Sequence, residues 1–101
     1  MKRAEVYVSN VLAGHLTEDN NRFAFEYVEN YNGQPVSLTM PVSKRNYTFV
    51  NFPPFFDGLL PEGQQLEGLL RQNKLDRSDY FSQLVAVGND LVGAVTIKLT
   101  V

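Results

Sequence analysis

Alternating apolar and polar residues dominate the N-terminal part of the chain. Valine alternates with charged or polar neighbours over Ala4–Ser9, which predicts a strand. Asn10 favours a turn, and Val11–Thr17 then predicts a second strand that forms a hairpin with the first. Gly14 interrupts the side-chain pattern of that strand, so we expect a bulge there or a close approach of another backbone.

A third strand follows and carries aromatic side chains on one face. After a polar turn at residues 18–21, Phe23, Phe25 and Tyr27 alternate with smaller or charged residues. Aromatic side chains on one face of a sheet pack well across neighbouring strands. We therefore expect the three segments to form an antiparallel meander whose aromatic face belongs to the core.

The middle of the chain has a weaker pattern. Val36–Met40 lies between two prolines and predicts a short strand. Val42–Val50 begins with a polar run before apolar residues return, and this segment predicts a loop, open to motion.

The C-terminal half changes to helical spacing. A short helix is expected over Pro54–Leu60, because proline suits the first turn of a helix and Pro61 ends it. Leucines at helical spacing predict a longer helix over Glu62–Lys74. Ser78 is expected to cap a third helix over Asp79–Val87. Alternation over Val92–Val101 predicts a final strand.

This order of elements predicts an α+β fold. The meander and the C-terminal strand form a small antiparallel sheet, and two or three helices pack on one side of it. The 101 residues suffice for a single domain, residues 1–101. The chain has no cysteine, no membrane-spanning stretch and no secretory signal, so we expect a cytoplasmic protein. Its net charge of −2 has the wrong sign for direct nucleic-acid binding.

The residue pattern does not predict a catalytic or cofactor site. His15 is the single histidine, and its sequence neighbours offer no catalytic partner. Asp57 and Glu62 flank a proline–glycine run, where they could bind a cation or act as acid and base, although helix capping or loop solvation explains them better. The basic pair Lys44 and Arg45 could contact phosphate or an acidic partner, or simply lie in an exposed loop. We expect a protein that is not an enzyme and binds no cofactor or metal.

Apolar side chains are crowded into the run Phe52–Gly63 and the residues just before it. Prolines and glycines normally mark a polar surface loop, so this run must pack on something. We assign Phe55 and Leu59 to the core on spacing alone. The other large apolar side chains are expected to contact a partner, and these are Phe49, Phe52, Phe56 and Leu60.

Several of these motifs together resemble a known family. SLTMP at Ser37–Pro41, FPPFFDGLLPEG at Phe52–Gly63, DYF with Leu84 at Asp79–Leu84, and GNDLVGAV at Gly88–Val95 occur in this order. Together with the hairpin segment Val6–Leu16, they resemble the N-terminal subdomain of HipA-type serine/threonine kinase toxins. The resemblance covers essentially the whole chain.

The resemblance also implies a partner. In those kinases a long catalytic core with nucleotide and metal sites follows this subdomain, whereas this chain ends at Val101. A free-standing copy is similar to HipS of the three-component HipBST toxin–antitoxin systems, in which a truncated kinase, HipT, and a helix-turn-helix protein, HipB, accompany it. The resemblance implies a non-catalytic antitoxin that binds the kinase where the fused subdomain would sit. It would thereby restrain a kinase whose family phosphorylates aminoacyl-tRNA synthetases.

A contact surface follows as a hypothesis. The aromatic run and the helix that begins at Glu62 would bury apolar surface on the kinase, and Gln64 and Gln65 would project toward its active-site cleft. Two alternatives stay open. The chain could complete or activate the kinase, or it could be a stand-alone ligand-binding domain. Direct DNA binding is disfavoured by charge, although the complex could reach DNA through its third component.

Overall fold

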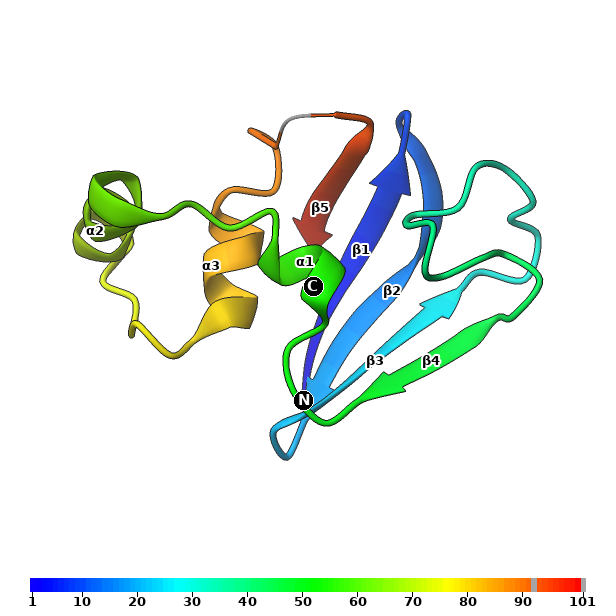
Figure 1. Cartoon of the computed structure of the whole chain (residues 1–101), viewed down its shortest axis with the longest axis horizontal. Coiled ribbons are helices and arrows are strands. Elements are labelled where there is room, and N and C mark those ends of the chain that lie inside the picture. The colour runs from blue at the N-terminus through cyan, green and yellow to red at the C-terminus, as the bar shows by residue number, and fades with distance from the viewer. Residues whose placement is uncertain (92, 101) are drawn as a thin grey trace.

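The structure is a computed structural model that describes residues 1–91 and 93–100. In this part of the chain, five antiparallel strands form one sheet in the order β4-β3-β2-β1-β5, and three helices accompany it (Figure 1). The predicted α+β fold is confirmed. The elements are β1 (Lys2–Val8), β2 (Val11–Asp19), β3 (Arg22–Tyr27), β4 (Asn46–Phe49), α1 (Pro54–Asp57), α2 (Gly63–Asn73), α3 (Tyr80–Ala86) and β5 (Val95–Leu99).

The predicted meander is confirmed in β1, β2 and β3. Both of its hairpins turn through two residues with left-handed backbones. The φ angles are 49° and 67° at Ser9 and Asn10, and 53° and 63° at Asn20 and Asn21. Two-residue turns with positive φ match the twist of the flanking strands, and asparagine tolerates this conformation better than most residues. Local turn chemistry therefore fixes the register of the meander.

Gly14 has both properties that its position in β2 predicts. The pairing register shifts between Val6 and Tyr7 of β1, directly after the pair that Val6 forms with Gly14. On the other side of β2, a β-carbon on Gly14 would lie 2.3 Å from the carbonyl oxygen of Glu26. A side chain at this position would collide with the backbone of β3, so glycine permits the strands to approach.

The prediction of a loop over Val42–Val50 is wrong, because β4 lies within it. Phe49 of β4 pairs with Phe23, and Tyr47 pairs with Phe25. The two aromatic residues of β4 thus extend the aromatic face of β3. The alternating pattern of β4 is only four residues long and follows a polar run, so it is a weak strand signal. Pairing with the neighbouring β3 stabilises it as a strand.

The prediction of a strand over Val36–Met40 is also wrong. This segment forms a turn in which the Met40 N–H donates a hydrogen bond to the carbonyl of Ser37, 3.0 Å away. The buried hydroxyl of Tyr27 anchors both ends of the turn. It accepts from the N–H of Val36 at 2.9 Å and donates to the carbonyl of Met40. The backbone groups here are satisfied by a tyrosine instead of a neighbouring strand.

The helix boundaries differ in two places from the expected ones. α1 ends at Asp57 and does not reach Leu60. α3 begins after Asp79, whose carboxylate accepts a hydrogen bond from the N–H of Ser82 at 3.1 Å. Asp79, and not Ser78, is therefore the N-cap. The long helix predicted over 62–74 is confirmed as α2.

The final strand is confirmed as β5, which pairs with β1. It is shorter than the predicted Val92–Val101, and both end residues of that prediction lie outside the described residues. The outer side of β5 is partly occupied, because the N–H of Ile97 donates to the carbonyl of Gly88 at 3.0 Å. The segment that follows α3 thus covers part of this sheet edge.

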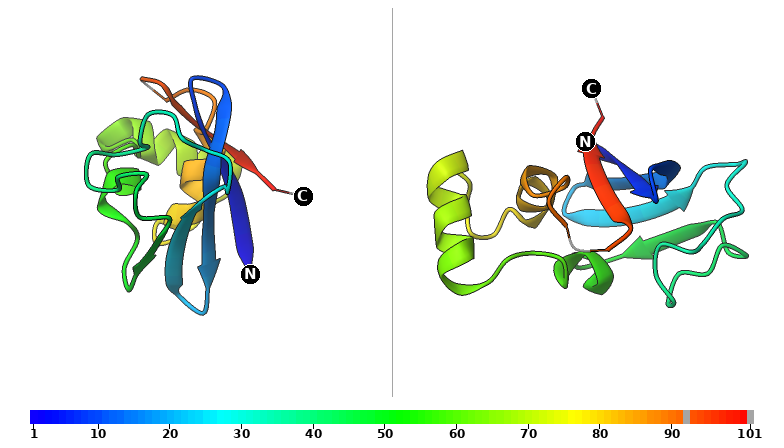
Figure 2. Two further views of the ribbon diagram at one scale, coloured as in Figure 1. Left: turned by 90° about the vertical axis from the view of Figure 1, so that its right-hand side faces the viewer. Right: turned by 90° about the horizontal axis from the view of Figure 1, so that it is seen from above.

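The helices gather on one side of the sheet and toward the β5 edge, and none of those in the described residues covers the other face (Figure 2). The core lies between the helix-side face of the sheet and the segments that cover it. None of the helices in the described residues is long and apolar enough to cross a membrane. The buried apolar residues are Ala4, Val6, Val8, Ala13, Leu16, Phe25, Tyr27, Tyr31, Val36, Met40, Phe52, Phe56, Phe81, Leu84 and Ile97.

Candidate interaction site

The helix α2 stands apart from the sheet, at the left of Figure 1. None of its residues is buried, and the helix on which it packs is α3. Its leucines Leu66, Leu69 and Leu70 are only half-buried. An isolated helix of this length is marginal in water. Its contacts with α3 and its connections to α1 and α3 must therefore hold it in place.

The first turn of α2 presents polar side chains to solvent. Glu62 occupies the N-cap in an extended conformation, and its side chain makes no capping hydrogen bond. Gly63 follows with a φ of +60°. This backbone conformation is strained for any residue that has a side chain, and glycine adopts it freely. Glu62, Gln64 and Gln65 are all exposed. The start of α2 thus offers a carboxylate, two amides and uncapped backbone N–H groups.

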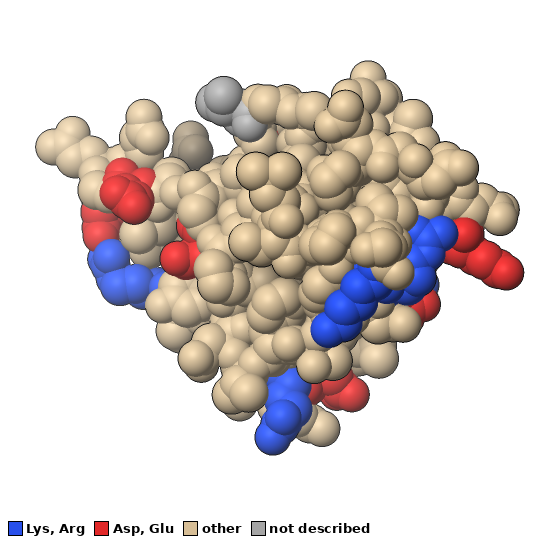
Figure 3. All heavy atoms as spheres, turned by 45° about the vertical axis from the view of Figure 1, so that its right-hand side comes forward, with Lys and Arg blue, Asp and Glu red and all other residues tan. Residues whose placement is uncertain are grey.

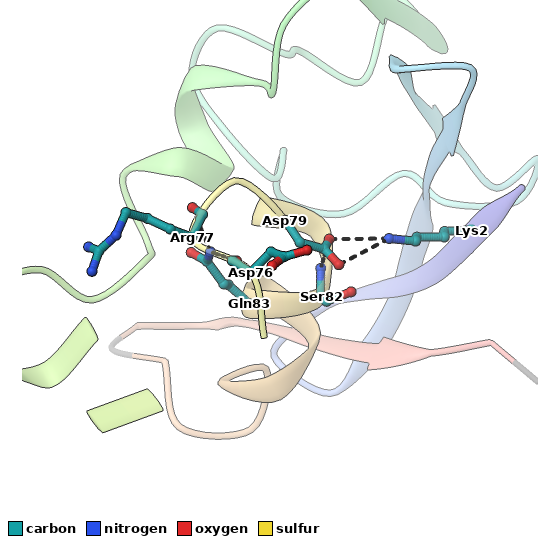
Figure 4. Close-up of polar contacts among 6 residues, drawn as sticks. All are labelled: Lys2, Asp76, Arg77, Asp79, Ser82 and Gln83. Atoms are coloured by element: carbon teal, nitrogen blue, oxygen red, sulfur yellow. Dashed lines mark hydrogen bonds and ion pairs between the residues drawn. The ribbon is translucent and has the colours of Figure 1, made fainter. Parts of the chain in front are cut away.

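A buried glutamine fixes the connection after α2. Gln83 of α3 is only 1% exposed. Its Nε2 donates hydrogen bonds to the carbonyl oxygens of Asp76 and Arg77, at 2.9 and 3.0 Å (Figure 4). Arg77 in turn forms an ion pair with Glu67 of α2. The direction in which α2 leaves the domain is therefore set by a polar connection to α3.

Asp79 ties the start of α3 to the first strand. The Lys2 ammonium donates to both carboxylate oxygens of Asp79, at 3.2 and 3.3 Å (Figure 4). Partial burial by itself raises the pKa of Asp79, but hydrogen bonds from Ser82 and the charge of Lys2 outweigh it and lower the pKa below its usual value. The carboxylate is thus stabilised in its charged form.

Two aromatic residues predicted as partner contacts are core residues instead. Phe56 is 0% exposed and Phe52 is 9% exposed. The Phe52 ring lies edge-on to Phe23, with 5.3 Å between centroids, and the Phe56 ring lies 6.0 Å from that of Phe25. Both rings complete the aromatic face of β3. The prediction that Phe56 contacts a partner is therefore wrong, because its ring is fully enclosed, whereas Phe52 keeps a small exposed part at a surface cleft.

The remaining predicted residues keep accessible surface. Phe55 and Leu59, predicted as core, lie half-buried against it, and so do Phe49 and Leu60, predicted as contacts. In a helix as short as α1, consecutive phenylalanines point in different directions, and spacing alone does not tell which one faces inward. Leu60 lies two residues before the N-cap of α2 and lines one cleft together with Gln65, so its exposed part adjoins the polar first turn of that helix.

Neither His15 nor Asp57, the polar residues considered in the sequence, belongs to a metal-binding group among the described residues. His15 lies in β2 with its side chain on the uncovered face, paired across strands with Glu5 and Glu26. Burial and the nearby Arg3 lower its pKa, and the two glutamates oppose this shift. Within the described residues, no three His, Cys, Asp or Glu side chains come close enough together to hold a metal ion. Asp57 is exposed at the end of α1.

Both residues of the basic pair before β4, Lys44 and Arg45, contact other groups of the chain. The Arg45 guanidinium donates to the carbonyls of Tyr31 and Glu29, at 2.7 and 2.9 Å. The Lys44 ammonium lies 5.1 Å from the centre of the Tyr47 ring. Arg45 therefore holds the loop together and is not a free phosphate ligand.

The exposed apolar residues Val50 and Tyr80, at 69% and 43%, were not identified from the sequence as surface residues. Val50 directly follows β4, whose strand pattern was itself missed. Tyr80 begins α3, where amphipathic spacing alone would place it near the core. Only the meeting of these two segments in space brings the side chains to one surface.

The fold and the exposed α2 define a small α+β domain with a projecting helix. A family model described as the HipA N-terminal domain matches residues 4–98. An uncharacterised protein of Haemophilus influenzae is 31% identical over 98 residues, which are 97% of this chain and 92% of that protein. A solved structure described as the N-terminal domain of HipA toxin superposes with a TM-score of 0.80 and 26% identity, covering 100% of this chain and 94% of that one.

The chain therefore belongs to the HipA N-terminal domain family. The resemblance seen in its sequence motifs is confirmed, and it is a HipA-related component of the toxin–antitoxin kind.

Proposed function

We propose that this protein is an antitoxin that binds a truncated HipA-like serine/threonine kinase in trans and inhibits it. Its membership of the HipA N-terminal domain family supports a partner of the HipA kind. The proposal assigns to the kinase, and not to this chain, the binding of nucleotide and metal.

The observation that carries the proposal is the position of α2. Eleven residues form a helix with no buried side chain, and this helix stands apart from the sheet (Figure 1). The half-buried Leu60 lies two residues before the N-cap and lines a cleft with Gln65 of the first turn. A kinase surface that covers Leu60 and the start of α2 would bury apolar area and pair the exposed amides, which favours association.

The same geometry suggests how binding inhibits. Gln64 and Gln65 carry flexible amides that both donate and accept hydrogen bonds. When placed in the active-site cleft of the kinase, they would exclude substrate or favour a kinase conformation that cannot position its phosphate-binding loop. Phe49 adds half-buried apolar surface in β4, which lies at the opposite end of the molecule from α2 (Figure 1).

A HipB-like helix-turn-helix protein completes the proposed assembly. DNA contact is assigned to that protein and not to this chain. The net charge of −2 disfavours a direct phosphate-binding role. Figure 3 shows a face whose atoms belong mostly to uncharged residues, with short streaks of Lys and Arg. This face lacks the broad basic surface that tracks a nucleic-acid backbone.

Co-elution with the kinase tests the proposal. The purified chain is mixed with a HipA-like kinase that lacks its own N-terminal domain, and the mixture is separated by size-exclusion chromatography. We expect one complex peak with wild-type protein and loss of that peak with Gln65→Arg, because a longer charged side chain replaces the amide. A matched variant, Gln72→Arg at the exposed far end of α2, should leave the complex intact. Two separate peaks with wild-type protein would contradict the proposal.

An activating subunit is the alternative with a specific basis, because the similar solved domain belongs to a toxin. Complex formation alone does not separate the two roles. The phosphorylation rate does, since it falls with an antitoxin and rises with an activator.

A further inference from the structure

A cleft of about 620 Å³ lies between the β2–β3 turn, the segment after β4 and the start of α3. Aromatic rings line it. Phe52 contacts Phe23 edge-on and lies 5.7 Å from the ring of Tyr80, measured between centroids. The exposed side chains of Val50 and Tyr80, 69% and 43% accessible, also line it. We call this feature the aromatic–acidic cleft.

The charges in the cleft are mainly negative. Three carboxylates line it, those of Glu18, Asp57 and Asp79, against the single ammonium of Lys2. Lys2 is bound to Asp79. Glu18 and Asp57 form no ion pair with any residue in the described ranges. The cleft therefore already holds one ammonium group and keeps two further carboxylates for another cation.

We propose that the aromatic–acidic cleft binds a basic–apolar segment of a protein partner, with an arginine or lysine beside an aliphatic residue. A guanidinium stacks on aromatic rings and pairs with carboxylates, which are the two kinds of group in this cleft. An aliphatic neighbour would cover Val50 and Tyr80. The sign of the charge excludes an anion, and the described residues offer no three-ligand group for a metal ion.

The identity of the partner rests on the proposed function, in which it is the kinase. The cleft is formed by different residues from the Leu60–Gln65 surface, so it is a second contact on the same domain. Two separate contacts on one kinase would fix the orientation of α2 in the active site, and they would raise specificity through charge complementarity.

Peptide binding to the free chain tests the cleft without the kinase. The probe is acetyl-Arg-Leu-Arg-Leu-amide, and the control is the same peptide with Glu in place of Arg. Backbone amide shifts are followed by NMR at low ionic strength, because at about 0.1 M salt the attraction between exposed charges more than about 10 Å apart is largely screened. We expect the basic peptide to shift the signals of Val50, Asp57 and Tyr80, and the acidic peptide to leave them unchanged. Equal shifts with both peptides, or none in the cleft, would overturn the proposal.

Charge variants of the cleft add a second test, because some should weaken peptide binding and another should strengthen it. Glu18→Lys combined with Asp57→Lys should weaken peptide binding by about tenfold or more, because two attractions become repulsions. Glu26→Lys combined with Asp90→Lys makes the same change in net charge at exposed positions outside the cleft, and it should have a much smaller effect. Lys2→Met should strengthen binding, since it frees the Asp79 carboxylate. If the two double variants weaken binding equally, the attraction is general and the cleft is not a site.

Repeating these variants with the kinase separates the two proposals. If wild-type protein does not bind the kinase, the proposed function fails while the peptide result still decides the cleft. If wild-type protein binds the kinase and the cleft variant binds as well as its control, the cleft is not the second contact and the proposed function stands.

Discussion

The side-chain amide of Gln83 donates a hydrogen bond to the main-chain carbonyl of Asp76 at 2.9 Å, and so joins α3 to the turn that follows α2. Gln83 is the buried polar side chain of the described core. A buried amide with satisfied donors restricts the backbone that it contacts. The orientation of α2, and with it the proposed contact surface, depends on this bond.

Replacing Gln83 by leucine should therefore destabilise the protein and loosen α2. The substitution leaves carbonyl groups of the turn without their donor, which costs about 1–3 kcal/mol in the free energy of unfolding. Urea denaturation measures this loss, and hydrogen exchange of the α2 amides should accelerate. Gln72→Leu, on the exposed part of α2, is the control. Unchanged exchange in α2 would show that Gln83 does not hold this helix.

Truncating Phe56 tests the corrected assignment of the aromatic run. Phe56→Ala removes a fully buried ring next to Phe25 and should lower the free energy of unfolding by about 3–5 kcal/mol. Phe55→Ala should lower the free energy of unfolding by less, because Phe55 is half-buried and part of its ring already faces solvent. Chemical denaturation of both variants gives the comparison. A larger loss for Phe55→Ala would restore the assignment made from spacing.

Two glycine substitutions should have opposite effects. A β-carbon at Gly14 would lie 2.3 Å from the Glu26 carbonyl oxygen, so Gly14→Ala must move β3 and should destabilise the protein by about 1–3 kcal/mol. At Gly68 in α2, a β-carbon meets nothing within 4 Å. Gly68→Ala should stabilise the helix by up to about 1 kcal/mol. Thermal melts of both variants decide this, and a stable Gly14→Ala protein would contradict the close approach of the strands.

The Lys2–Asp79 pair should appear in the pH dependence of stability. The folded-state pKa of Asp79 lies below the usual 3.8. Its contribution is then complete above the pKa of the unfolded carboxyl group and is lost as pH falls through the lower, folded-state pKa. The free energy of unfolding of wild-type protein should fall more steeply than that of Asp79→Asn between about pH 5 and pH 2. Parallel curves would show that the pair contributes nothing.

The sequence predicted the elements whose signals are local. Alternation and polar turn residues predict β1, β2 and β3, and leucine spacing predicts α2. β4 was missed because four residues of alternation become a strand only beside β3, whose Phe23 and Phe25 they cover.

The surface could be predicted only in part. The sequence predicts Gln64 and Gln65 at the start of a helix, and both lie exposed in the first turn of α2, with Glu62 as its N-cap. The sequence does not show which of the two adjacent phenylalanines in α1 faces inward. That depends on how the chain enters this short helix, which residue spacing alone does not predict. The aromatic–acidic cleft combines residues as distant in sequence as Lys2 and Asp79, so only the folded chain brings them together.

The rate at which a HipA-like kinase phosphorylates its protein substrate, measured with and without this chain, tests the central proposal most directly. We predict that the rate falls as the chain is added, that it reaches a minimum once the kinase is saturated, and that Gln65→Arg protein restores it. A rate that is unchanged by saturating wild-type protein, or that rises, would contradict an antitoxin role.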